Sequence, residues 1–164
     1  GLVYSPEYQP EVAPALAASG HHPGFILCTE GSSGMSGLLE DYSTALEPAP
    51  ATADSECFWL YSSGSTGRPK GAVHRHRDIA ATCVHYAVDT LGMVQGDICF
   101  SAAKLFFAYG LGNAMTFPLW VGGTAVLSGQ RPSPEITFQI IEEQKPTSYF
   151  GMPTRYAAQL RELE

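Results

Sequence analysis

The segment from residue 62 to residue 71 combines residue types that bind phosphate, and it reads SSGSTGRPKG. It contains three glycines, four hydroxyl side chains and one lysine. Glycine lets backbone N–H groups approach an anion without a Cβ in the way, and successive N–H groups can form an anion-binding concavity. The hydroxyls add donors, and the lysine adds a mobile positive charge. We therefore expect phosphate to be bound by the following residues: Ser62, Ser63, Gly64, Ser65, Thr66, Gly67 and Lys70.

The order of residues in this segment excludes two common nucleotide-binding loops. The pattern G-x-x-x-x-G-K-[ST] cannot be aligned, because Pro69 precedes Lys70 and Gly71 follows it. The G-x-G-x-x-G pattern of a dinucleotide site is also missing from the segment. The string instead resembles the glycine-serine-threonine loop of the adenylate-forming superfamily, which includes acyl-CoA synthetases, luciferases and the adenylation domains of peptide synthetases. That resemblance implies that the loop holds the β- and γ-phosphates of ATP.

A second segment, residues 100–113, is rich in aromatic residues and glycine and reads FSAAKLFFAYGLGN. From residue types alone it predicts either an aromatic core patch with glycine hinges or a pocket for a flat apolar ring. It is similar to a stretch of the benzoate-CoA ligase branch of the superfamily. The resemblance implies that Phe107 is an aromatic gating residue and that Ala108, Tyr109 and Gly110 line the acyl pocket.

The resemblance implies that the parent enzyme is an ATP-dependent aryl-CoA ligase. In such an enzyme an aryl carboxylate, benzoate or a similar acid, attacks the α-phosphorus of Mg-ATP and releases pyrophosphate. The thiol of coenzyme A then attacks the acyl-adenylate. Because positioning and charge neutralisation dominate the first step, Lys70 is expected to be catalytic. ATP, Mg²⁺ and coenzyme A are the implied cofactors, and no residue of this chain is assigned as a metal ligand.

The resemblance extends from about residue 58 to residue 156 and covers only part of the superfamily's length. The acidic magnesium-binding motif, the ribose-binding aspartate and the C-terminal domain with its lysine are not found before Glu164, and the chain starts without Met. We therefore expect an internal fragment of the large N-terminal domain, inactive alone, with the remainder of its own chain as its partner. Two alternatives stay open: a stand-alone nucleotide- or anion-binding module, and an inert structural fragment.

Other polar residues near these segments also have ordinary structural explanations. His74 and His76 flank Arg75 and suggest a general base, but no nucleophile or metal partner is spaced with them. Packing or polar contacts at a helix start are therefore the favoured interpretation. Lys104 lies in an apolar neighbourhood, where a salt bridge at a buried edge and a solvent-facing ammonium group are equally open.

Strands and helices alternate around both segments and must position them. A strand over 57–61 leads into the phosphate segment, and a helix over 77–91 follows it. Further strands are predicted at 2–4, 25–28, 98–100, 124–127 and 147–150, and further helices at 7–18, 38–46, 134–144 and from Pro153. This alternation predicts an α/β fold with a mostly parallel sheet flanked by helices on both faces. Residues 1–54 are expected to form a partial α/β lead-in with a connector, and residues 55–164 an incomplete AMP-binding-type subdomain.

The composition excludes several classes of protein. Of the 164 residues 45% are hydrophobic and 15% are charged, which is typical of a globular protein and not of a disordered one. The net charge is -7 and there is no Lys/Arg block, so no nucleic-acid partner is expected. No apolar run approaches the ~20 residues that span a bilayer, so no membrane partner is expected either. The four cysteines are far apart, which favours reduced, buried thiols in a cytoplasmic protein.

Overall fold

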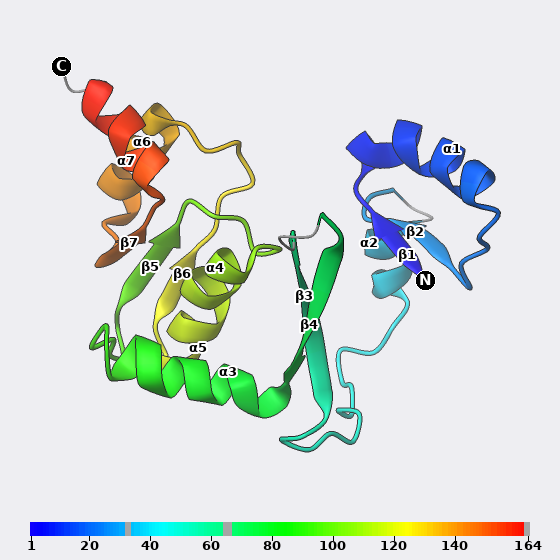
Figure 1. Ribbon diagram of the computed structural model, residues 1–164, viewed down its shortest axis with the longest axis horizontal. Coiled ribbons are helices and arrows are strands. Elements are labelled where there is room, and N and C mark those ends of the chain that lie inside the picture. The colour runs from blue at the N-terminus through cyan, green and yellow to red at the C-terminus, as the bar shows by residue number, and fades with distance from the viewer. Residues whose placement is uncertain (32–33, 64–66, 163–164) are drawn as a thin grey trace. The chain divides into compact units, whose positions relative to one another are not determined.

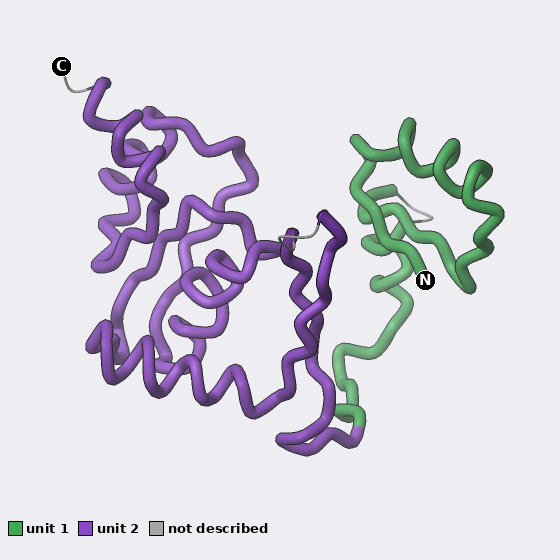
Figure 2. Tube along the Cα trace, viewed as in Figure 1, with its two compact units in different colours: residues 1–49 green, residues 50–164 purple. Residues whose placement is uncertain are grey.

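The computed structural model describes residues 1–31, 34–63 and 67–162. They form two compact units, residues 1–49 and residues 50–164, which Figure 2 shows in different colours. The first unit ends inside the region that was expected to be a lead-in and connector. None of the helices in the described part of the chain is long and apolar enough to cross a membrane.

The first unit is built on two short parallel strands. Strand β1 (Leu2–Tyr4) pairs with β2 (Ile26–Cys28). Between them the chain forms a 3₁₀ turn, η1 (Pro6–Tyr8), and helix α1 (Gln9–Ser19). Helix α1 ends at Gly20, which adopts the left-handed conformation that commonly terminates helices. This strand–helix–strand order confirms the alternation predicted from the sequence.

Helix α2 (Met35–Glu40) follows β2 and lies earlier in the chain than the helix expected over 38–46. The end of the expected helix was wrong for a local reason. The hydroxyl of Ser43 accepts a hydrogen bond from the backbone N–H of Ala45 at 3.1 Å. Such a bond offers the backbone a turn in place of the helix ladder, and Pro48 then prevents the helix from resuming.

The second unit begins with an antiparallel hairpin, formed by β3 (Glu56–Ser63) and β4 (Pro69–Arg75). The sequence predicted a strand over 57–61 and a loop from there to residue 71. The prediction stopped too early, because the ladder continues until Ser63 lies opposite Pro69. Glycine and serine are poor strand formers, and here the register of the partner strand overrides that preference. Among the described residues of β3 and β4, none is buried.

A three-stranded parallel sheet forms the centre of the second unit, in the order β6–β5–β7 (Figure 1). Its strands are β5 (Ile98–Ser101), β6 (Thr124–Val126) and β7 (Ser148–Phe150). The helices are α3 (His76–Thr82), α4 (Ala108–Leu111), α5 (Phe117–Val121), α6 (Pro134–Gln144) and α7 (Pro153–Arg161), with π-helical turns η2 (Cys83–Val88) and η3 (Gly112–Thr116). Helix α6 has the bounds expected from Pro134 and its apolar pattern.

Neighbouring side chains of β5 show that helices cover both faces of this sheet. Cys99 packs into a buried cluster with Cys83 of η2 and Phe117 of α5. Phe100 points to the other face, since successive strand residues alternate. It stacks on Tyr149, and the ring of Tyr149 in turn contacts Tyr156 of α7, with ring centroids 5.4 and 5.6 Å apart respectively. The predicted α/β architecture, a parallel sheet flanked by helices, is therefore confirmed.

All four cysteines are free thiols. Cys83 and Cys99 are fully buried in the sheet core, and burial raises the pKa of both thiols. Cys28 and Cys57 are only half-buried. The expectation of buried thiols therefore holds for two of the four, and the other two lie on the more exposed strands β2 and β3.

Candidate active site

An open groove of about 800 Å³ lies where the three parallel strands end. The segments that follow β5, β6 and β7 all contribute to its walls, as does Tyr61 of the hairpin. In α/β sheets ligands bind outside the carboxyl ends of the strands, and most small-molecule pockets have volumes of roughly 300–1,000 Å³. The groove therefore has the position and size of a ligand site.

The predicted acyl-pocket segment forms one wall of this groove. Phe107, Ala108 and Tyr109 line it. Phe107 is the N-cap of α4 and stays extended, with 58% of its side chain exposed, and its ring lies against that of Phe106. Ala108 is the first residue of α4. Its side chain is a single methyl group, so it fills little of the groove that it lines.

Tyr109 connects the segment that follows β5 with the segment that follows β7. Its hydroxyl donates a hydrogen bond to the carbonyl oxygen of Gly151, which follows β7, at 3.3 Å. Partial burial raises the pKa of Tyr109, with smaller contributions from neighbouring tyrosines, Tyr156 first among them. The phenol therefore stays protonated at neutral pH, where it can act as a donor.

Gly110, the fourth residue of the predicted acyl pocket, lies behind this wall and does not line the groove. It is buried, and a Cβ at this position would lie 2.2 Å from the carbonyl oxygen of Lys104. Glycine is therefore required for α4 to pack against the backbone of the loop that follows β5. Its placement is that of a spacing residue beside the groove.

The described part of the phosphate segment lies at the end of the hairpin where β3 leads into β4. Ser62 and Ser63 end β3, and Ser62 pairs with Lys70 of β4. Directly opposite residues of an antiparallel pair project from the same face, so Ser62 and Lys70 share one face of the hairpin. Both are exposed, as is Gly67 with its positive φ of 78°. The remaining three residues of the prediction, Gly64, Ser65 and Thr66, lie outside the described residues.

Tyr61 connects the hairpin with the groove, and the sequence analysis did not select it. It lines the groove together with Phe107 and Tyr109. Tyr61 lies opposite Gly71, and the closest ring atom is 3.1 Å from where a Cβ of Gly71 would be. The alternation of strand residues was the available signal, because it places Tyr61 on the opposite face from Ser62.

Two arginines in the groove were also missed. Arg131 follows β6 and Arg155 lies in the first turn of α7. Pro132, Met152 and Pro153 supply apolar surface beside them. The rule that ligands bind at the carboxyl ends of parallel strands would have pointed to these positions, because each lies a few residues beyond a predicted strand. The groove thus combines apolar walls with positive charge.

The polar residues at the end of β4 make contacts at the start of helix α3, as the favoured interpretation predicted. His74 Nδ1 lies 3.4 Å from Asp78 Oδ2, and its ring stacks on Phe58. Asp78 accepts a hydrogen bond from the backbone N–H of Arg75 at 3.0 Å, which lowers the pKa of Asp78. These contacts fix the entry into α3, so none of them requires a catalytic role for His74.

The described residues of the chain do not include a group of three or more His, Cys, Asp or Glu side chains able to hold a metal ion. Mg²⁺ in nucleotide sites is bound through one or two carboxylates together with phosphate oxygens. A nucleotide-bound Mg²⁺ would not need such a group, and the absence of assigned metal ligands from this chain stays a prediction.

Comparisons with known proteins show the family to which the chain belongs. The chain matches the AMP-binding enzyme family over residues 6–164. It is 52% identical over 130 residues to a benzoate–CoA ligase of Thauera aromatica, an alignment that covers 79% of this chain and 25% of that protein. The chain therefore spans about a quarter of the length of this curated relative.

Two solved structures share the fold. A benzoate CoA ligase from Burkholderia xenovorans LB400 superposes with a TM-score of 0.84 at 38% identity, over 97% of this chain and 31% of that one. An anthranilate CoA ligase in complex with anthranoyl-AMP superposes with a TM-score of 0.85 at 31% identity, over 96% of this chain and 32% of that one. Both similarities extend over nearly all of the chain.

Proposed function

Because the chain belongs to the AMP-binding enzyme family, we propose that it forms part of an ATP-dependent aryl-CoA ligase. One observation carries this proposal: a single groove is lined both by the Phe107–Ala108–Tyr109 segment and by Tyr61, the residue that precedes the phosphate segment. A substrate held in the groove lies beside the hairpin end that is expected to bind phosphate. Such proximity is what transfer of an adenylyl group to a carboxylate requires.

A carboxylate is a poor acyl donor, because its oxygen would have to leave as oxide. Transfer of the carboxylate to AMP turns that oxygen into part of a good leaving group. The aryl carboxylate attacks the α-phosphorus of ATP, the bond to the β-phosphate oxygen breaks, and pyrophosphate leaves. The thiol of coenzyme A then forms the thioester and releases AMP, with loss of its proton. Ser62, Ser63 and Lys70 would bind and neutralise the departing phosphates, which are the atoms on which negative charge develops.

The groove suits an aryl acid for two reasons. A flat ring needs apolar and aromatic surface, and Phe107, Ala108 and Met152 provide it. A carboxylate needs positive charge or hydrogen-bond donors nearby, and Arg131 lines the same groove. The names of the similar ligases, which specify benzoate and anthranilate, support this substrate class.

The remaining cofactor is Mg²⁺, which would accompany ATP and reduce the charge on its phosphates. No residue of this chain is assigned to it as a ligand. A cytoplasmic location, the lack of nucleic-acid and membrane partners, and dependence on further polypeptide for activity stay predictions.

The test is aryl-acid-dependent exchange of pyrophosphate into ATP, measured on the full-length ligase that contains this segment. We expect exchange with benzoate or a substituted benzoate, little exchange with hexanoate, and thioester formation when coenzyme A is added. Exchange with aliphatic acids and none with aryl acids would contradict the proposal. The 164-residue chain alone is expected to show no exchange, and calorimetry that detected ATP binding without any response to benzoate would favour a nucleotide-binding module.

A further inference from the structure

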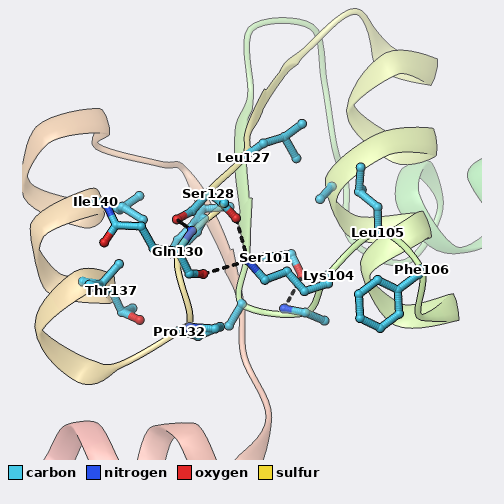
Figure 3. Close-up of a pocket in the computed structure, with 16 residues that line it drawn as sticks. Ser101, Lys104, Leu105, Phe106, Leu127, Ser128, Gln130, Pro132, Thr137 and Ile140 are labelled. Atoms are coloured by element: carbon cyan, nitrogen blue, oxygen red, sulfur yellow. Dashed lines mark hydrogen bonds between the residues drawn. The ribbon is translucent and has the colours of Figure 1, made fainter. Parts of the chain in front are cut away.

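Lys104 lies between the groove and a second, apolar cavity of about 350 Å³, and it lines both. Its ammonium group donates hydrogen bonds to the carbonyl oxygens of Ser128 and Gln130, at 2.8 and 2.7 Å. Figure 3 shows both bonds as dashed lines. The sequence left a salt bridge and a solvent-facing ammonium open for this lysine. The structure has a third arrangement, a cation bound by two backbone carbonyls.

Arg155 binds the same loop from another element. Its Nη1 atom donates a hydrogen bond to the carbonyl oxygen of Pro132 at 2.8 Å. The acceptors on residues 128, 130 and 132 are every second carbonyl of the segment that leads from β6 to α6. Two cations from two different elements, the loop after β5 and helix α7, therefore hold this loop at three positions.

These contacts determine where a wall of the groove lies. The loop runs between β6, which ends at Val126, and α6, which begins at Pro134. Arg131 and Pro132 line the groove from this loop. Irregular backbone has no ladder of its own to define its position, and hydrogen bonds from charged donors are about twice as strong as neutral ones. The hydrogen bonds from Lys104 and Arg155 therefore define the position of this loop.

Lys104 is also connected to the opposite wall through its own backbone. Its carbonyl oxygen accepts a hydrogen bond from the backbone N–H of Phe107 at 3.1 Å. The same carbonyl is the atom against which Gly110 packs. One residue thus holds the loop after β6 through its side chain and the start of α4 through its backbone. Displacement of either contact changes the separation between the two walls.

We propose that Lys104 and Arg155 are positioning residues that set the width of the aryl-acid groove by binding the carbonyls of residues 128, 130 and 132. The proposal rests on the proposed function, because it assigns the groove to the aryl acid. Neither residue is required to touch the substrate. Loss of Lys104 removes the partner of two carbonyls and loss of Arg155 the partner of one, and either loss lets the loop, with Arg131, move away from the groove.

The first experiment replaces Lys104 in the full-length ligase with Met and with Arg. Lys104→Met keeps the length of the aliphatic chain and removes the donor, whereas Lys104→Arg retains a cation. We expect Lys104→Met to raise the KM for the aryl acid about ten-fold with less than a two-fold change in the KM for ATP, and Lys104→Arg to restore most of the difference. A purely structural role would lower kcat with the amount of folded enzyme and leave both KM values unchanged, and that result would overturn the proposal.

Arg155→Met tests the same contact from α7 and serves if Lys104→Met does not yield folded protein. We expect the same selective rise in the KM for the aryl acid, with Arg155→Lys intermediate. Lys145→Met is the matched control, because Lys145 is an exposed lysine at the end of α6. It should leave both KM values as in the wild type. A change in the control equal to that in Lys104→Met would also overturn the proposal.

Hydrogen–deuterium exchange separates this proposal from the proposed function. Peptides that cover residues 127–133 should exchange about ten-fold faster in Lys104→Met than in the wild type or in Lys145→Met, whatever the substrate is. If the wild-type ligase shows no exchange of pyrophosphate with aryl acids but these peptides respond as expected, the function fails and the positioning role stands. If hydrogen–deuterium exchange in these peptides were the same in Lys104→Met as in the wild type, the positioning role would be refuted.

Discussion

The β3–β4 hairpin and the β6–β5–β7 sheet lie in the same unit but differ in what surrounds them (Figure 1). Among the described residues of the hairpin strands none is buried. In the sheet, Cys99 and Phe100 at the centre of β5 are buried and covered by helices on opposite faces. The hairpin carries the residues expected to bind phosphate, and the sheet ends carry the groove.

This difference corresponds to two different binding problems. A phosphate group is recognised by donors and positive charge, which exposed ends of a hairpin can present without a packed core. An aryl ring is recognised by shape, and shape requires walls that do not move. We infer that the packed sheet supplies the fixed walls of the site and the hairpin supplies the part that binds phosphate.

The largest expected effect compares the same substitution in the two regions. Phe117→Ala removes a ring that is 4% exposed and contacts the cluster around Cys99, so it should lower the free energy of unfolding by about 3–5 kcal/mol. Phe58→Ala removes a half-buried ring of β3 that stacks on His74, and should cost about 1 kcal/mol. Chemical denaturation of the purified chain measures both. Equal losses would show that the hairpin is packed as tightly as the sheet.

A smaller effect is expected from a pair of glycine substitutions. Gly110→Ala places a Cβ 2.2 Å from the backbone oxygen of Lys104, which cannot move without the loop, and should cost about 2 kcal/mol. Gly71→Ala places a Cβ 3.1 Å from the ring of Tyr61, which is 68% exposed and can rotate, and should cost less than about 0.5 kcal/mol. Thermal denaturation distinguishes the two. A costlier change at Gly71 would contradict the proposed difference in rigidity.

The smallest effect concerns pH and the turn before β5. Asp97 accepts hydrogen bonds from the backbone N–H of Val94 at 2.8 Å and from the hydroxyl of Thr147 at 2.7 Å, and these lower the pKa of its carboxyl group. A carboxyl whose pKa is lowered on folding stabilises the fold above its unfolded pKa of about 3.9, and that contribution is lost as the pH falls through the folded value.

Asp97→Asn should therefore lower the Tm by less than about 2 °C at pH 7, and the difference from the wild type should shrink as the pH falls below about 4. Melting curves between pH 3 and pH 7 provide the measurement. Asp78→Asn, next to the hairpin, makes a matched comparison, since its carboxyl pKa is also lowered by a backbone hydrogen bond. A difference that grows on acidification would refute the role given to Asp97.

The sequence was sufficient to predict the parallel sheet of the second unit and helix α6, but not the end of α2 or the length of the hairpin. Pro134 and the apolar pattern placed α6 at its observed bounds, and in the structure Ser133 caps the helix. The strands of the parallel sheet were also predicted to within a few residues. Both succeed because local patterns encode them.

The groove was less predictable, because it depends on contacts between distant parts of the chain. Phe107, Ala108 and Tyr109 were selected through a family resemblance, whereas Tyr61 and Arg131 reach the groove through strand pairing and the order of the sheet. The hydrogen bonds of Lys104 join residues 24 and 26 positions apart in the sequence. No local pattern encodes such pairs, so only the folded chain reveals them.

The most direct test of the division between hairpin and groove is a pair of KM measurements in the exchange of pyrophosphate into ATP by the full-length ligase. Lys70→Met should raise the KM for ATP or lower kcat by about 10²-fold and leave the KM for benzoate nearly unchanged. Ala108→Leu fills the groove and should raise the KM for benzoate at least about ten-fold, with the KM for ATP within a factor of two of the wild type. The account would be contradicted if either variant changed both KM values together. It would also be contradicted if Lys70→Met raised mainly the KM for benzoate and Ala108→Leu mainly the KM for ATP.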